Sequence, residues 1–238
     1  MMMRWSTVPR DPTHEQVHQS AVLKPRMSLT QPLITPEVSA VNISLMKNAS
    51  PLQCPSPDAW LKYVMAHFDQ FLLDHAAAEK KAAGMALSML SHYPDKARLV
   101  TAMAELAAEE MVHFREVVKL IQERDLQLTA DEKDPYIHEI RSWIRQGSEA
   151  YLLDRLLTGA VIEARGAERF KLVADALSAG SLKRFYASLA RSEARHYELF
   201  LDLAAEYFPS ETVESRWLEL LSAESRCMQA LPIRAALH

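Results

Sequence analysis

Residues 110–113 have the sequence EMVH, and residues 193–196 repeat the same spacing as EARH. Side chains at positions i and i+3 lie on one face of an α-helix, so each stretch would present a carboxylate and an imidazole side by side. Hard carboxylate oxygens with one imidazole per metal suit iron or manganese better than a metal that prefers thiolates. One such motif alone proves little, and we assign a third copy at residues 15–18, in a proline-rich region without helical periodicity, to chance.

The informative feature is a lone glutamate that precedes each motif at almost the same distance. Glu79 lies 31 residues before Glu110, and Glu163 lies 30 residues before Glu193. Glu168 is a rival to Glu163, but a residue five positions later faces about 140° away on an ideal helix. Two helical hairpins related by an approximate twofold axis would bring the matched groups together, and two divalent cations would balance the repulsion between the carboxylates. The sequence therefore predicts a two-metal site with the ligands Glu79, Glu110, His113, Glu163, Glu193 and His196.

The composition favours an all-α fold, because Ala, Leu, Glu, Arg and Met dominate most of the chain and only 5 of its 238 residues are Gly. Ser148 and Ser181 are predicted helix N-caps, and Thr129 with Glu132 is a predicted capping box before a short connecting helix. Very short turns join the first long helix to the second and the third to the fourth, whereas roughly 24 residues separate the two pairs. We therefore expect a ferritin-like four-helix bundle of two antiparallel hairpins with a long crossover and an extra C-terminal helix. The predicted helices span residues 57–91, 95–124, 130–145, 148–180, 181–208 and 211–229.

The beginning of the chain differs from the rest, because residues 1–57 hold eight of the twelve prolines. We expect residues 1–55 to form a largely irregular extension and residues 56–238 to form the helical domain. Ser56 and Pro57 are typical of a helix start, with an N-cap followed by proline at the first helical position.

Charge and cysteine content exclude several classes of protein. The net charge of −4 argues against a uniformly basic nucleic-acid binder. Residues 141–195 nevertheless contain ten Lys and Arg against six Asp and Glu, which leaves open either a phosphate-facing surface or an ordinary solvated face. The two cysteines form no CxxC pair, which excludes zinc ribbons and favours a reducing, cytoplasmic compartment. No apolar run of about 18 residues predicts a membrane span.

The chain resembles the bacterial tRNA 2-methylthio-N6-isopentenyladenosine hydroxylases over about residues 52–208. The resemblance rests on the two ExxH motifs together with residues 73–83, LDHAAAEKKAA, and residues 163–170, EARGAERF. It implies a di-iron centre held by the six predicted ligands, with O₂ as co-substrate. It also implies a monooxygenase that hydroxylates the isopentenyl group of a modified adenosine beside the anticodon of tRNA.

The chain has no flavin or dinucleotide fingerprint such as GxGxxG, so we expect an external reductase or ferredoxin to supply electrons. Two other functions stay open, namely another small di-iron oxygenase or oxidase, acting for example on a fatty aldehyde, and ferritin-like iron storage. A monomer or dimer is favoured over a storage shell. Small residues near Glu163, namely Gly159, Ala160, Gly166 and Ala167, either make room for a substrate or allow close helix packing.

Overall fold

The computed structural model describes residues 50–238, which lie within one compact unit of the chain. The expected extension over residues 1–55 therefore lies almost entirely outside the described residues. Within them, all regular secondary structure is helical, which confirms the all-α prediction. The helices are α2 (Asp58–Ala66), α3 (Phe68–His92), α4 (Ala97–Gln122), α5 (Pro135–Ser142), α6 (Ser148–Ala176), α7 (Ser181–Tyr207) and α8 (Ser210–Ala230).

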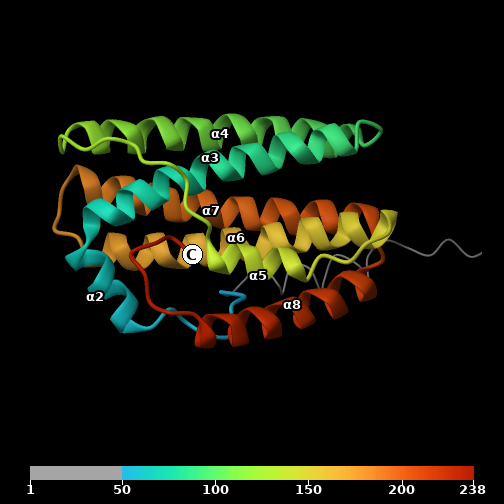
Figure 1. Ribbon diagram of the computed structural model, residues 1–238. Helices are drawn as coiled ribbons and strands as arrows, with labels where there is room; N and C mark the ends of the chain where they lie inside the picture. The colour runs from blue at the N-terminus through green and yellow to red at the C-terminus, as the bar shows by residue number, and fades with distance from the viewer. Residues whose placement is uncertain (1–49) are drawn as a thin grey trace, which may run out of the picture. The chain divides into compact units, whose positions relative to one another are not determined.

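Two helical hairpins form the bundle, with α3 packed along α4 and α6 packed along α7 (Figure 1). The segment between α4 and α6 contains α5 and carries the chain from one hairpin to the other. α8 packs mainly on α6, on the side away from α3 and α4. This arrangement confirms the ferritin-like connectivity and the extra C-terminal helix. No helix in residues 50–238 is both long and apolar enough to cross a membrane.

The first predicted helix, residues 57–91, is broken at His67 into α2 and α3. His67 has φ −126° and ψ 44°, outside the helical region. Its backbone N–H still bonds to the carbonyl oxygens of Tyr63 and Val64, and its ring stacks on Tyr63 at 4.1 Å between centroids. These local contacts close the end of α2, so the chain can change direction there without leaving the polar groups of His67 unpaired.

The predicted start of the connecting helix and three predicted caps were wrong. Pro57, not Ser56, is the N-cap of α2, whose first residue is Asp58. α5 begins after Asp134, whose carboxylate accepts hydrogen bonds from the backbone N–H groups of residues 136 and 137, and Pro135 is its first residue. Proline has a fixed φ suited to this position, so it outweighs the expected capping box upstream. Ser148 and Ser181 are the first helical residues, and the residues before them, Gly147 and Gly180, occupy the N-cap positions without side-chain hydrogen bonds.

Two apolar clusters fill the bundle on either side of a polar band. One cluster includes Leu106 and Phe200, and the other includes Phe71 and Val117. Each of the four long helices, α3, α4, α6 and α7, carries one buried glutamate, which lies at or near the boundary between its residues in one cluster and its residues in the other. Apolar packing on both sides therefore fixes the position of the polar band in the middle of the bundle.

The last eight residues, 231–238, leave α8 and return to the bundle, where residues 235–237 are buried. The backbone N–H of Leu237 donates to Oδ2 of Asp74 at 2.7 Å. Its carbonyl oxygen accepts from Nη1 of Arg169 at 2.8 Å. Helices α3 and α6 thus hold this C-terminal tail, which the sequence did not predict.

Candidate metal centre

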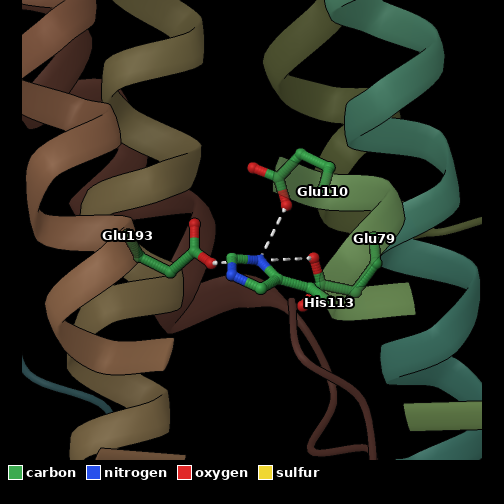
Figure 2. A group of neighbouring side chains, drawn as sticks. All are labelled: Glu79, Glu110, His113 and Glu193. Carbon is green, nitrogen blue, oxygen red and sulfur yellow. Dashed lines mark hydrogen bonds and ion pairs between the residues drawn. The ribbon is translucent and has the colours of Figure 1, made fainter. Parts of the chain in front are cut away.

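The structure brings the six predicted ligand residues to one place in the middle of the bundle. Their side chains form two groups, and within each group one ligand atom per residue lies within 4.8 Å of all the others. Figure 2 shows the first group, which joins α3, α4 and α7. The first group is Glu79, Glu110, His113 and Glu193, and the second is Glu110, Glu163, Glu193 and His196.

Glu110 and Glu193 belong to both groups, and each directs one oxygen to each imidazole. Oε2 of Glu110 lies 3.3 Å from Nδ1 of His113, and its Oε1 lies 2.9 Å from Nδ1 of His196. Oε1 of Glu193 lies 3.9 Å from Nδ1 of His113, and its Oε2 lies 3.3 Å from Nδ1 of His196. The two carboxylates therefore lie between the two halves of the site, in the position of bridging groups.

The other two glutamates lie at the two ends of the cluster. Oε2 of Glu79 is 3.6 Å from Nδ1 of His113, and Oε2 of Glu163 is 3.9 Å from Nδ1 of His196. Each half of the site thus has one terminal carboxylate and one imidazole, in addition to the two shared carboxylates. This pseudo-symmetry follows from the matching spacing of the two hairpins in the sequence.

Burial and charge perturb the acid–base behaviour of the cluster. Burial raises the pKa of Glu79 well above its usual value, and the nearby charges of Glu193 and Glu110 raise it further. Burial likewise raises the pKa of Glu163, again assisted by Glu193. Burial opposes ionisation of Glu110 too, but contacts with the two imidazoles outweigh it and lower its pKa. Without cations, burial, reinforced by the neighbouring carboxylates, thus favours the protonated forms of Glu79 and Glu163.

The two imidazoles respond in the opposite direction. Burial lowers the pKa of His113, but hydrogen bonding to Glu110 and Glu79 more than compensates and raises it to about 10. For His196, burial is again outweighed, by Glu110 and Glu193, and the pKa rises to about 12. Without cations, positive imidazolium groups therefore partly balance the carboxylates, and bound metal ions would take over that role.

The cluster fits a site for two iron ions. Adjacent ligands that each lie about 2.1 Å from one octahedral cation are about 3 Å apart, close to the shorter separations seen here. Oε1 of Glu193 and Oε1 of Glu110 are buried without a hydrogen bond of regular geometry within residues 50–238, and the latter has only its ion-pair contact with His196. Buried oxygens are normally satisfied, so these atoms are suited to a cation. Four carboxylates with two imidazoles form a hard donor set of the kind that iron and manganese prefer.

His75 supports Glu79 from behind and was not recognised from the sequence. It is fully buried, and its Nε2 lies 2.6 Å from Oε1 of Glu79. Burial lowers the pKa of His75 to about 3, so the ring is neutral near pH 7. Nε2–H then donates to Glu79, and Nδ1 accepts from the hydroxyl of Tyr186 at 3.3 Å. The only signal in the sequence was the i, i+4 spacing of a histidine and a glutamate.

Glu109 forms an ion pair with His196 and was also missed. Its Oε2 lies 3.2 Å from Nε2 of His196, whereas Nδ1 of that ring faces Glu110 and Glu193. Glu109 also accepts hydrogen bonds from the hydroxyl of Ser192 and from Nη2 of Arg195, the latter at 2.9 Å. Carboxylates of this kind orient metal-binding imidazoles. Nothing in the sequence separates Glu109 from an ordinary surface glutamate.

Glu168, the sequence rival of Glu163, points away from the cluster. Its Oε1 accepts from the backbone N–H of Ser56, and its Oε2 accepts from the hydroxyl of the same serine, both at 2.7 Å. Nη1 of Arg165 also donates to Oε2, at 2.9 Å. Glu168 therefore attaches the start of the helical region to α6.

A cavity of about 470 Å³ between α3, α5 and α6 reaches the cluster and is lined by all four of its carboxylates. Apolar residues on its walls include Ile140, Ile162 and Phe170. Gly166 also lines it, and a Cβ added there would lie 3.6 Å from Cγ of Glu193. Gly159 lines the cavity too, and a Cβ there would lie 3.1 Å from the ring of Phe200. Gly159 therefore allows close packing against Phe200, and both glycines border the cavity beside the site.

Comparisons with known proteins identify relatives of this chain. A family described as tRNA-(MS[2]IO[6]A)-hydroxylase (MiaE) matches residues 43–238. A tRNA 2-(methylsulfanyl)-N(6)-isopentenyladenosine(37) hydroxylase from Pseudomonas putida is 38% identical over 172 residues, covering 72% of this chain and 83% of that protein. The protein of the same name from Salmonella typhimurium is 30% identical over 216 residues, with coverages of 69% and 78%.

A solved structure is also similar to this chain. It is described as protein 43 with aldehyde deformylating oxygenase activity, from Synechococcus. The TM-score is 0.74 and the identity is 34%, over 77% of this chain and 92% of that one.

Proposed function

The chain belongs to the tRNA-(MS[2]IO[6]A)-hydroxylase (MiaE) family, and from that membership we propose that it is an O₂-dependent di-iron monooxygenase acting on tRNA. Its substrate would be the isopentenyl group of 2-methylthio-N6-isopentenyladenosine beside the anticodon, and its product the hydroxylated side chain. The observation that carries this proposal is the pseudo-symmetric cluster of four glutamates and two histidines at the wall of an apolar cavity.

The proposed ligand assignment follows the two halves of the cluster. Glu79 and His113 would bind one iron ion, and Glu163 and His196 would bind the other. Glu110 and Glu193, which belong to both groups, would contribute to holding both ions. When bound, the iron ions would supply the reduction of O₂ and the insertion of one oxygen atom into a C–H bond.

The protein's own contribution would be position and shielding. The apolar walls of the cavity, including Ile140, Ile162 and Phe170, suit a branched hydrocarbon substituent and exclude water from it. The hydrogen bond from His75 would fix the orientation of Glu79, and Glu109 would fix that of His196.

The stoichiometry of the reaction requires an external source of electrons. Forming one alcohol and one water from O₂ and a C–H bond consumes two electrons and two protons from outside the substrate. We infer that a separate reductase or ferredoxin provides these electrons. We also propose that the enzyme acts on tRNA in the cytoplasm and that it is a monomer or dimer.

Mass spectrometry of digested tRNA tests the substrate and the reaction together. Deleting the gene should remove the hydroxylated nucleoside and leave its unhydroxylated precursor, and the wild-type gene should restore it. An unchanged nucleoside profile would reject the proposed reaction.

Iron analysis of purified variants tests the ligand assignment. Glu110→Ala and His196→Ala should lose bound iron and hydroxylation, whereas Glu116→Ala, at an exposed carboxylate of the same helix as Glu110, should retain both. Retention of iron and activity in both ligand variants would show that the assignment is wrong.

The solved structure from Synechococcus supports aldehyde deformylation as a second candidate function. Purified iron-loaded protein should be incubated with a fatty aldehyde and, separately, with the modified tRNA. Turnover of the aldehyde alone would favour the second candidate.

A large multisubunit shell in size-exclusion chromatography would instead favour iron storage.

A further inference from the structure

Arg155 lies on the wall of the cavity that reaches the metal centre. It is a partly buried residue of α6, and its guanidinium carbon lies 5.6 Å from the centroid of the Tyr151 ring. Its Nη2 donates a long hydrogen bond of 3.3 Å to the hydroxyl of Ser88 on α3. The side chain therefore reaches across the cavity from α6 towards α3.

The charge of Arg155 has no counter-charge among residues 50–238. It forms no ion pair with a carboxylate there, and its Nη1 is buried without a hydrogen-bond partner. Arg165 on the same helix is paired with both Glu224 and Glu168. A guanidinium stays charged in proteins, and a partly desolvated charge without a partner is unfavourable. An anion that enters the cavity would meet a side chain that has no ion-pair partner among these residues.

Outside the metal centre, the Asp, Lys and Arg residues that line the cavity are Asp74, Lys81, Asp134, Arg141 and Arg155. Asp74 is at one end and Ser88, the partner of Arg155, is at the other, 14 residues later. That separation is about 21 Å at 1.5 Å per residue. Asp134 also lines the cavity, and its Oδ2 lies 3.8 Å from Nδ1 of His238 at the tail that Asp74 holds. Arg155 therefore lies at the end of the cavity away from Asp74 and Asp134.

Arg155 and Glu163 are separated by two turns of α6, and both line the cavity. The rise between them is about 12 Å. This distance is comparable to the reach of an extended purine nucleotide from its phosphate to the far end of a substituent on N6. A phosphate held at Arg155 would therefore leave the base and its substituent pointing towards the metal centre.

We propose that Arg155 binds a backbone phosphate next to the target nucleotide and thereby positions the substituent for reaction. This inference rests on the proposed function, because it takes tRNA as the substrate. A phosphate is preferred over a base edge because guanidinium offers only donors and forms its strongest hydrogen bonds with anionic oxygens.

Binding to an anticodon stem–loop RNA that carries the isopentenylated nucleotide tests the proposal. Fluorescence anisotropy should be measured for wild type, Arg155→Met, Arg155→Lys and the control Arg115→Met, which removes the same charge from an exposed site on α4. Arg155→Met should weaken binding about tenfold or more and reduce the salt slope by about 0.7 to 1, the value for one phosphate contact. Arg155→Lys should keep the salt slope and lose only part of the affinity, and Arg115→Met should resemble wild type.

Replacing single phosphates of the stem–loop by neutral methylphosphonates identifies the contact. One position next to the target should weaken binding by wild type but have no further effect on Arg155→Met. If Arg155→Met keeps wild-type affinity and salt slope, or remains as sensitive as wild type to every replacement, the proposal is wrong. Failure of wild type itself to bind the stem–loop would instead overturn the proposed function.

Thermal unfolding separates this role from a structural one. Arg155 forms no ion pair and only one long hydrogen bond, to Ser88, in the described fold, so Arg155→Met should unfold at nearly the same temperature as wild type. If Arg155→Met unfolds much earlier, Arg155→Lys carries the test, and loss of its salt slope would overturn the proposal.

Discussion

Replacing Glu224 by alanine should strongly destabilise the protein. Glu224 on α8 and Arg165 on α6 are both 0% exposed. Oε1 of Glu224 accepts from Nε of Arg165 at 2.8 Å and from the hydroxyl of Tyr136 on α5 at 3.2 Å. Removing one partner of a buried pair leaves an uncompensated charge and costs about 3–5 kcal/mol. Because Glu168 still accepts from Arg165, we expect a loss near 3 kcal/mol, at the lower end of this range.

Urea unfolding followed by far-ultraviolet circular dichroism measures this loss as a shift of the midpoint at constant slope. A loss of about 3 kcal/mol should lower the melting temperature by roughly 10 °C for a domain of this size. The double variant Arg165→Met/Glu224→Leu removes both charges and fills the space, so it should be more stable than Glu224→Ala. A loss below about 1 kcal/mol for Glu224→Ala, or a double variant less stable than it, would refute the reasoning.

Two further predictions concern packing and pH. Gly159→Ala should cost up to about 2 kcal/mol, because its Cβ would lie 3.1 Å from the buried ring of Phe200 and the cost of overpacking exceeds the gain in helix propensity. Gly84→Ala, with no atom within 4 Å of the added Cβ, should instead stabilise α3 by up to about 1 kcal/mol in thermal unfolding, and equal effects would contradict this contrast. Burial raises the pKa of Asp74 from 3.8 to about 6, so its protonated form stabilises the fold below pH 4 and that stability is lost as the pH rises through 6. Unfolding between pH 4 and pH 7 should show a loss of up to about 3 kcal/mol that Asp74→Asn lacks, and identical pH profiles for the two proteins would exclude this effect.

The long helices and their connectivity could be predicted because they depend on local signals. Helix-forming residues and short turns define each hairpin, and the matching intervals from Glu79 to Glu110 and from Glu163 to Glu193 relate the two hairpins. The structure places all six predicted side chains in one cluster, and their role as iron ligands stays a prediction.

The features that the sequence did not reveal depend on contacts between distant residues. The supporting role of Glu109 arises only when α7 brings Ser192 and His196 beside it. The position of the tail depends on Asp74 and Arg169, which precede Leu237 by many residues. Neither arrangement has a periodicity that a single sequence can display.

The position of the tail in the sequence also determines the order in which the bundle and the cavity wall can form during synthesis. Residues 235–237 follow all the described helices in the chain, so the ribosome makes them after the elements that hold them. A nascent chain can pair its hairpins and gather the six acidic and imidazole groups while the cavity still lacks the wall that Leu237 provides. Completion of the cavity wall is thus a late step in synthesis and folding, and it is separate from assembly of the bundle.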